Sequence, residues 1–278
     1  MLVPSTDGVE VAVHDLGGAG PLVLLSHATG FHGLVWRPVA AHLARSGFHC
    51  LALDYRGHGD TAPPPGWTVD WYDYGDDAIA VVEAVAEPGG IIGVGHSMGG
   101  AGLLMAALHD PLAFRGLLLY EPIVLPPGGI GSPQPSPLAT GARRRRSSFP
   151  SYEAAIENFG AKPPLQAFTP EALEAYVRGG FVPGEDGQVH LKCRPEHEAL
   201  TFEASAGHDT WSRLGEVRCP VWVVAGRRQE GQPSTIAEQI AEQLPEGRYV
   251  ELPALDHFGP MTDPHTVAGL VVDLAATL

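Results

Sequence analysis

Short apolar runs alternate along most of this chain with stretches whose apolar residues recur every three or four positions. Several runs are apolar at nearly every position, which indicates strands buried on both faces of a sheet. The predicted strands span residues 9–13, 22–25, 48–53, 90–94, 117–120, 221–225 and 249–252. The predicted helices span residues 35–44, 74–86, about 103–109, a segment that begins near Thr235, and 265–278. This alternation predicts an α/β fold whose mostly parallel sheet is covered by helices on both faces.

One helix start carries a specific signal. Thr235 is followed three residues later by Glu238, and Ile236, Ile240 and Leu244 come at helical spacing. This pattern is typical of a capping box, so we expect Thr235 to cap that helix.

Residues 122–216 depart from the alternation of strands and helices. The segment is first rich in Pro and Gly and then contains short helical pieces such as 170–178, with no clear strand–helix–strand unit. Its aromatic residues supply core material, which disfavours a disordered linker. We therefore expect residues 1–121 and 217–278 to form the core, and residues 122–216 to form a cap over the strand ends.

The charge balance limits the partners of the chain. With 17 basic and 32 acidic residues the net charge is −15, which disfavours binding to nucleic acids and to anionic membranes. The run Arg143–Arg146 is a local exception, and it predicts either a solvated loop or a contact with an anionic substrate or partner. The N-terminus lacks the basic and apolar regions of a signal peptide, so we expect a cytoplasmic protein.

The three cysteines are too few and too scattered for a disulfide framework or a zinc site. No HExxH motif is found, and we expect neither a metal nor another cofactor.

The segment Gly95-His96-Ser97-Met98-Gly99 fits a G-x-S-x-G motif between a predicted strand and a predicted helix. That context is typical of a nucleophile elbow, a tight turn that raises a serine hydroxyl above the sheet. The turn requires small neighbours, which Gly95 and Gly99 provide. We interpret Ser97 as a nucleophile, with the following helix directing its N-terminal N–H groups at developing negative charge.

Four segments together resemble the α/β-hydrolase family: SHATG after the third strand, DYRGHG after the fourth, GHSMGG after the fifth and LDHFGP after the last. The resemblance covers nearly the whole chain. It implies a sheet of about eight strands and a mainly helical cap inserted after the sixth strand.

The family's chain order of Ser, acid and His selects a base among the 13 histidines. His257 follows the last predicted strand, where the resemblance places the base. The oxyanion hole is then expected from the backbone N–H of Met98 and of Thr29, although Ala28 or Gly30 could replace Thr29 as the donor. His27 and the Asp54–His58 segment are expected to brace these loops.

The acid departs from the family's pattern. The usual position, three residues after Gly226, is occupied by Gln229, which cannot stabilise an imidazolium. Glu230 lies one residue further along. Glu121 follows the strand 117–120 at the sheet edge where such active sites form, and some members of the family, including haloalkane dehalogenases, take their acid from that strand. We favour Glu121 and keep Glu230 as the alternative.

These residues predict a serine hydrolase that acts through an acyl-enzyme, most simply on carboxylic esters of small to medium apolar molecules. Phe31 and Trp36, near the oxyanion loop, are candidate substrate contacts. The same triad could serve a C–C bond hydrolase or lyase, or a thioesterase, and the fold also hosts non-catalytic small-molecule receptors. Substrate identity and oligomeric state stay open.

Overall fold

The computed structural model describes residues 1–130 and 136–278. Its centre is an eight-stranded sheet in the order β1-β2-β4-β3-β5-β6-β10-β11. The strands of this sheet are β1 (Leu2–Pro4), β2 (Glu10–Gly18), β3 (Leu22–Ser26), β4 (His49–Leu53), β5 (Ile91–His96), β6 (Phe114–Tyr120), β10 (Val221–Gly226) and β11 (Gly247–Leu252). Strand β2 pairs antiparallel with both β1 and β4, and the other pairs of this sheet are parallel. The prediction of a mostly parallel α/β sheet is confirmed.

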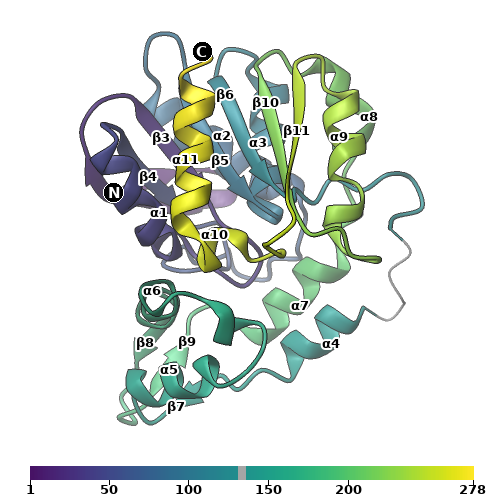
Figure 1. Ribbon diagram of the computed structural model, residues 1–278. Helices are drawn as coiled ribbons and strands as arrows, with labels where there is room; N and C mark the ends of the chain where they lie inside the picture. Colours follow the sequence, from purple (N-terminus) through teal and green to yellow (C-terminus); the bar gives the residue numbers. More distant parts are fainter. Residues whose placement is uncertain (131–135) are drawn as a thin grey trace.

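Helices cover both faces of this sheet (Figure 1). They are α1 (Arg37–Arg45), α2 (Tyr72–Val85), α3 (Met98–His109), α9 (Ala237–Gln243) and α11 (Pro264–Ala275), and the short α10 (Gly259–Thr262) lies at the lower end of α11. Successive side chains of a strand point to opposite faces. In β3, Leu24 accordingly packs with α2 and α3, whereas Val23 and Leu25 pack with α1 and α11. Burial on both faces explains why β3 is apolar along its length.

An insertion follows β6, as expected, and most of it lies beyond the lower edge of the sheet in Figure 1, whereas its last helix lies beside α9. Its helices are α4 (Pro137–Arg143), α5 (Tyr152–Gly160), α6 (Pro170–Gly180), α7 (Pro195–Glu203) and α8 (Thr210–Arg213). A small antiparallel sheet joins them, in the order β7 (Ser148–Phe149), β9 (Val189–Leu191) and β8 (Phe181–Pro183). Strands of two or three residues are too short to show a period, so the sequence did not predict them. The cap boundaries 122–216 stay a prediction.

Hydrogen bonds join the cap to the core at several points. Trp71 Nε1 donates to the Thr201 carbonyl at 2.9 Å, and the Tyr74 and Thr201 hydroxyls lie 2.8 Å apart. His32 Nε2 donates to the Tyr176 carbonyl at 3.0 Å. The cap is therefore held over the carboxyl ends of the parallel strands.

The predicted capping box is wrong. Thr235 ends a 3₁₀ turn, Pro233–Thr235, and its hydroxyl donates to the Gln232 carbonyl instead of accepting a helix N–H. Helix α9 begins only at Ala237. The fixed φ of Pro233 favours a turn that starts two residues earlier than the pattern suggested. In the described part of the chain, no helix combines the length and apolarity that a bilayer crossing requires.

Candidate active site

Ser97 lies at the turn between β5 and α3. Its φ of 55° and ψ of −116° are strained for a residue with a side chain. A Cβ on Gly95 would come within 2.7 Å of the Gly100 Cα, and a Cβ on Gly100 would come within 2.7 Å of the Pro122 side chain. Only glycines permit so close an approach. The geometry is that of the predicted elbow, and Ser97 keeps 6% of its surface exposed.

The loop that carries His257 is held against this elbow. The Tyr120 hydroxyl donates to the Asp256 carbonyl at 2.7 Å, and His96 Nε2 donates to the His257 carbonyl at 2.8 Å. The rings of His96 and His257 lie 4.8 Å apart. The structure therefore brings His257 beside the residue that precedes Ser97.

Glu121 contacts His257 directly. Its Oε2 accepts a hydrogen bond from His257 Nδ1 at 2.6 Å, and its Oε1 accepts one from the Gly226 N–H at 2.9 Å. Glu121 is 1% exposed and has a φ of 44°, which turns the chain sharply as it leaves β6. Glu230 is exposed, and its side chain makes no hydrogen bond within residues 1–130 and 136–278. The structure thus pairs Glu121, rather than Glu230, with the imidazole.

This pairing fixes the proton on His257. An ionised carboxylate only accepts hydrogen bonds, so Nδ1 carries the hydrogen and Nε2 is left as a proton acceptor. His96 is in a different state, because burial and the nearby His257 lower its pKa well below the usual value. His96 is accordingly neutral and holds its hydrogen on Nε2.

Two hydrogen bonds of the His27 ring stabilise the loop after β3. His27 Nδ1 donates to the Ala28 carbonyl at 2.8 Å, and Nε2 accepts from the Tyr55 N–H at 3.0 Å. Burial lowers the pKa of His27 to about 3, so the ring stays neutral and both bonds are kept. Within the described residues, neither the Thr29 N–H nor the Met98 N–H donates a hydrogen bond. Both N–H groups are therefore free to donate a hydrogen bond to a substrate oxygen.

Within residues 1–130 and 136–278, the Asp54–His58 segment makes no hydrogen bond to Ser97, Glu121 or His257, but it anchors the loops around them. Asp54 accepts hydrogen bonds from the Gly33 N–H at 2.5 Å, the Asp60 N–H at 2.7 Å and His14 Nε2 at 2.8 Å. Burial alone would raise the pKa of Asp54, but hydrogen bonding to His14 and the histidines nearby lower it. His14, Asp54 and Asp60 lie close enough together to hold a metal ion. Lys192, however, forms an ion pair with Asp60 at 2.6 Å, so this trio already has charged and hydrogen-bonded partners.

Arg56 is fully buried and forms a two-pronged pair with Asp77 of α2, at 2.7–3.2 Å. The sequence analysis did not find Asp77, although a signal was present. Asp77 falls on the apolar stripe of its helix, beside Tyr74, Ala78 and Val81. A charged residue at such a position needs a buried partner.

The two candidate substrate contacts lie in different surroundings. Phe31 belongs to an aromatic cluster with Phe168 and Tyr176 of the cap and Phe258 beside His257, with ring centres 5.0–6.2 Å from its own. Trp36 has no exposed surface and packs within the core on the α1 face. Of these two residues, Phe31 alone lies beside the loop that carries His257.

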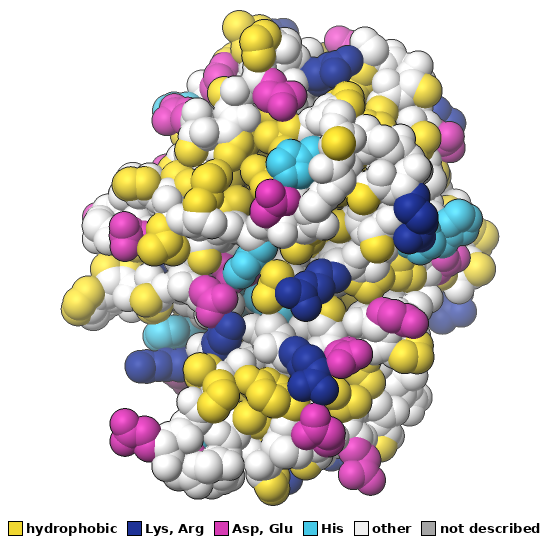
Figure 2. All heavy atoms as spheres, turned by 90° about the vertical axis from the view of Figure 1, so that its left-hand side faces the viewer, with side chains coloured by type: hydrophobic (Ala, Val, Ile, Leu, Met, Phe, Trp, Pro, Cys, Tyr) yellow, Lys and Arg dark blue, Asp and Glu magenta, His cyan; other side chains and the backbone are white. Residues whose placement is uncertain are grey.

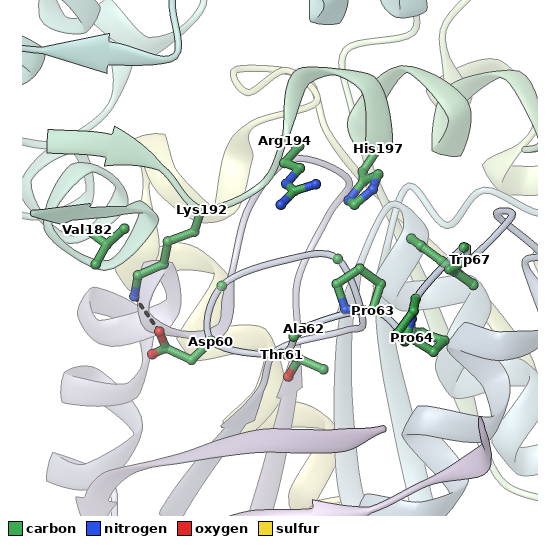
Figure 3. Close-up of a pocket in the computed structure, with 14 residues that line it drawn as sticks. Asp60, Thr61, Ala62, Pro63, Pro64, Trp67, Val182, Lys192, Arg194 and His197 are labelled. Atoms are coloured by element: carbon green, nitrogen blue, oxygen red, sulfur yellow. Dashed lines mark hydrogen bonds and ion pairs between the residues drawn. The ribbon is translucent and has the colours of Figure 1, made fainter. Parts of the chain in front are cut away.

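A cavity of about 640 Å³ opens between the loop after β4 and the cap (Figure 3). Its walls are formed by Gly57, residues 59–67, Val182, Lys192, Arg194 and His197. In Figure 3 the Arg194 and His197 side chains point from the cap toward the proline loop. Lys and Arg side chains also gather across the middle of the face drawn in Figure 2, between the core and the cap. The triad candidates do not line this cavity.

Comparison with known proteins agrees with this geometry. A sequence profile described as the Alpha/beta hydrolase family matches residues 22–270. The chain belongs to this family. This α/β-hydrolase is 24% identical over 276 residues to a bifunctional esterase/perhydrolase of Acinetobacter calcoaceticus, with 95% of each chain covered. It is 30% identical over 233 residues to a pimeloyl-[acyl-carrier protein] methyl ester esterase of Methylococcus capsulatus, covering 82% of this chain and 84% of the relative.

Solved structures show the same fold. The E-2-(acetamidomethylene)succinate hydrolase superposes with a TM-score of 0.78 at 21% identity, covering 99% of both chains. A thermophilic esterase from Thermogutta terrifontis gives a TM-score of 0.72 at 22% identity, covering 100% of this chain and 98% of the other. At these identities the likeness establishes the α/β-hydrolase fold with its insertion after β6.

Proposed function

We propose that this α/β-hydrolase cleaves carboxylic esters through an acyl-enzyme on Ser97. The observation that carries the proposal is the 2.6 Å hydrogen bond between His257 Nδ1 and the buried Glu121. It leaves Nε2 as a proton acceptor on a residue whose backbone carbonyl accepts a hydrogen bond from His96, the residue before Ser97. A serine hydroxyl needs such a base because it is a weak nucleophile at neutral pH.

In the proposed reaction, Ser97 Oγ attacks the ester carbonyl carbon while its proton passes to His257 Nε2. The carbonyl oxygen becomes an oxyanion, which the N–H groups of Met98 and Thr29 stabilise. The tetrahedral intermediate then expels the alcohol, which takes the proton from His257. Water then attacks the acyl carbonyl carbon while one of its protons passes to His257 Nε2. The second tetrahedral intermediate breaks its bond to Ser97 Oγ, which takes the proton back from His257 as the carboxylic acid leaves.

Glu121 has a separate part in this scheme. It keeps the hydrogen on Nδ1 and stabilises the imidazolium that forms when Ser97 is deprotonated. The Gly226 N–H fixes the orientation of its carboxylate. Glu121 therefore acts through His257 and needs no contact with the substrate.

The aromatic cluster around Phe31 supports an apolar acyl or alcohol group in the substrate. Phe168 and Phe258 have ring centres 5.7 Å apart, and Phe258 also lies 5.4 Å from the His257 ring. Apolar walls with few polar groups are usual for small-molecule pockets. The two relatives described above are named as esterases, which also supports ester cleavage.

A panel of p-nitrophenyl esters of increasing acyl length tests the proposal. We expect turnover by the wild-type protein and none by Ser97→Ala at an unchanged melting temperature. A folded wild-type protein that cleaves no member of the panel would contradict ester hydrolysis. Turnover of acyl thioesters or of C–C substrates in its place would identify the thioesterase or the C–C hydrolase alternative.

The receptor alternative needs a different measurement, because a receptor could bind esters without cleaving them. A fluorophosphonate probe reacts with an activated serine and poorly with an ordinary one. We expect labelling of the wild-type protein and none of Ser97→Ala. Ligand binding without any labelling would favour the receptor.

A further inference from the structure

The run Arg143–Arg146 divides into residues with different surroundings. Arg143 is 37% exposed and forms ion pairs with Glu196 and Glu203 on the outside of the cap. Arg145, two residues later, points inward and keeps 17% of its side chain exposed. The two side chains therefore have different roles in spite of their shared sequence context.

Arg145 joins three segments of the cap. Its Nη1 donates to Glu198 of α7 and its Nη2 donates to the Tyr176 hydroxyl of α6. Glu198 is 9% exposed and Tyr176 is buried. Burial alone would lower the pKa of Arg145, but Tyr176 and Glu198 raise it above its usual value. Arg145 is therefore charged where it contacts Glu198 and Tyr176.

This pair lies against the loop that carries the proposed oxyanion donor. A Cβ on Gly30 would come within 2.5 Å of Glu198 Oε1 and 3.3 Å of Arg145 Nη1, so the glycine backbone packs directly on the pair. Gly30 has a φ of 77° and is the third residue of a turn closed by the Phe31 N–H and the Ala28 carbonyl at 3.1 Å. A type II turn requires this positive φ at its third residue.

The turn is thus held from two sides. His27 bonds the Ala28 carbonyl from the core, and the Arg145–Glu198 pair packs on Gly30 from the cap. A glycine has no side chain of its own to limit its conformation, so contacts from neighbours must do so. An oxyanion donor is effective only within a few tenths of an ångström of its best position.

We propose that Arg145, together with Glu198, is a positioning residue that fixes the Gly30 turn and with it the direction of the Thr29 N–H. The inference rests on the proposed function, because it assigns the pair to the oxyanion hole of the same reaction. The cap then does more than enclose the substrate: it completes the geometry of a backbone donor in the core.

Two variants disturb the contact from opposite sides. Arg145→Lys keeps the charge but loses the two-pronged contact with Glu198 and Tyr176. Gly30→Ala places a methyl group against Glu198. The matched controls are Arg143→Lys and Gly47→Ala. Arg143 forms its ion pairs on the outside of the cap. Gly47 has a positive φ of 86°, and a Cβ added there would have no neighbour within 4 Å.

The assay separates transition-state binding from substrate binding. We measure kcat and KM with a p-nitrophenyl ester, the inhibition constant of an alkyl boronic acid that forms a tetrahedral adduct with Ser97, and the melting temperature. Both test variants should lower kcat by about tenfold to a hundredfold with KM changed by less than about threefold. The boronic acid should bind more weakly by the same factor as kcat falls. The two controls should match the wild-type protein in kcat, KM and inhibition.

The inference is overturned if Arg145→Lys and Gly30→Ala keep wild-type kcat, or if their losses appear in KM alone, as expected for a pair that only holds the cap together. If one variant does not fold, the other decides. A folded wild-type protein without ester turnover or boronate inhibition would instead overturn the proposed function, and this inference with it. An active wild-type protein with unaffected variants overturns this inference only.

Discussion

Replacing Glu121 with glutamine should change the proton on His257 and leave the shape of the site intact. Glu121 Oε1 accepts the Gly226 N–H and Oε2 accepts His257 Nδ1–H. In Glu121→Gln the amide oxygen should stay on the buried Gly226 N–H, which donates to Oε1 of Glu121, and the amide NH₂ then faces His257. Two donors cannot face each other, so His257 should move its hydrogen to Nε2. That nitrogen can then no longer take the Ser97 proton.

The magnitude follows from losing both the correct tautomer and the charge beside the imidazolium. Comparable replacements of a triad acid cost about 10³–10⁴ in kcat, which corresponds to about 4–5.5 kcal/mol in the activation free energy. The assay is kcat on a p-nitrophenyl ester, with the melting temperature measured on the same samples. Glu230→Gln is the matched control, because Glu230 is exposed and should leave kcat unchanged.

The opposite order would refute this reasoning. If folded Glu121→Gln stays within about threefold of the wild-type kcat while Glu230→Gln loses about a hundredfold, the loop after β10 supplies the acid. The hydrogen bond between Glu121 and His257 would then be structural.

Two further predictions concern stability. Burial lowers the pKa of His27 to about 3 and that of His58 to about 4. Below pH 6.5 these two histidines become protonated in the unfolded chain but stay neutral in the folded chain. Each residue should therefore lower the free energy of unfolding by about 2 kcal/mol at about pH 5. Urea unfolding at several pH values measures this loss, and a stability that is flat between pH 7 and pH 5 would contradict it. Arg56→Gln leaves Asp77 buried without its charged partner and should lower the free energy of unfolding, measured in urea, by about 3 kcal/mol or more. Arg143→Gln should leave the melting temperature unchanged. Equal melting temperatures for the two variants would show that the Arg56 pair contributes little.

The sequence predicted the central sheet because strands that are buried on both faces are apolar at nearly every position. Strands β3 and β5 are buried on both faces, and their nearly unbroken apolar runs set them apart from the amphipathic helices. The strands of the cap have two or three residues and no such signal. The start of α9 was predicted wrongly because a proline two residues before Thr235 starts a 3₁₀ turn, which competes with the capping pattern.

The candidate site was predictable where a local motif requires a backbone shape. The turn at Ser97 follows from glycines that only a tight elbow needs. The choice between Glu121 and Glu230 stayed open, because it depends on a contact across 136 residues of chain. The inward side chain of Arg145 was hidden for a similar reason. Its partners Tyr176 and Glu198 come from other segments of the cap, and four consecutive arginines give no sign of which one turns inward.

The most direct measurement is mass spectrometry of the protein quenched during turnover of a slowly hydrolysed p-nitrophenyl ester. We expect a fraction of the wild-type protein to carry the added mass of one acyl group, on the peptide that contains Ser97. The adduct should be absent from Ser97→Ala and should form far more slowly in His257→Ala. Steady ester turnover with the acyl group on another residue, or with no adduct at all when deacylation is shown to be rate-limiting, would contradict nucleophilic catalysis by Ser97.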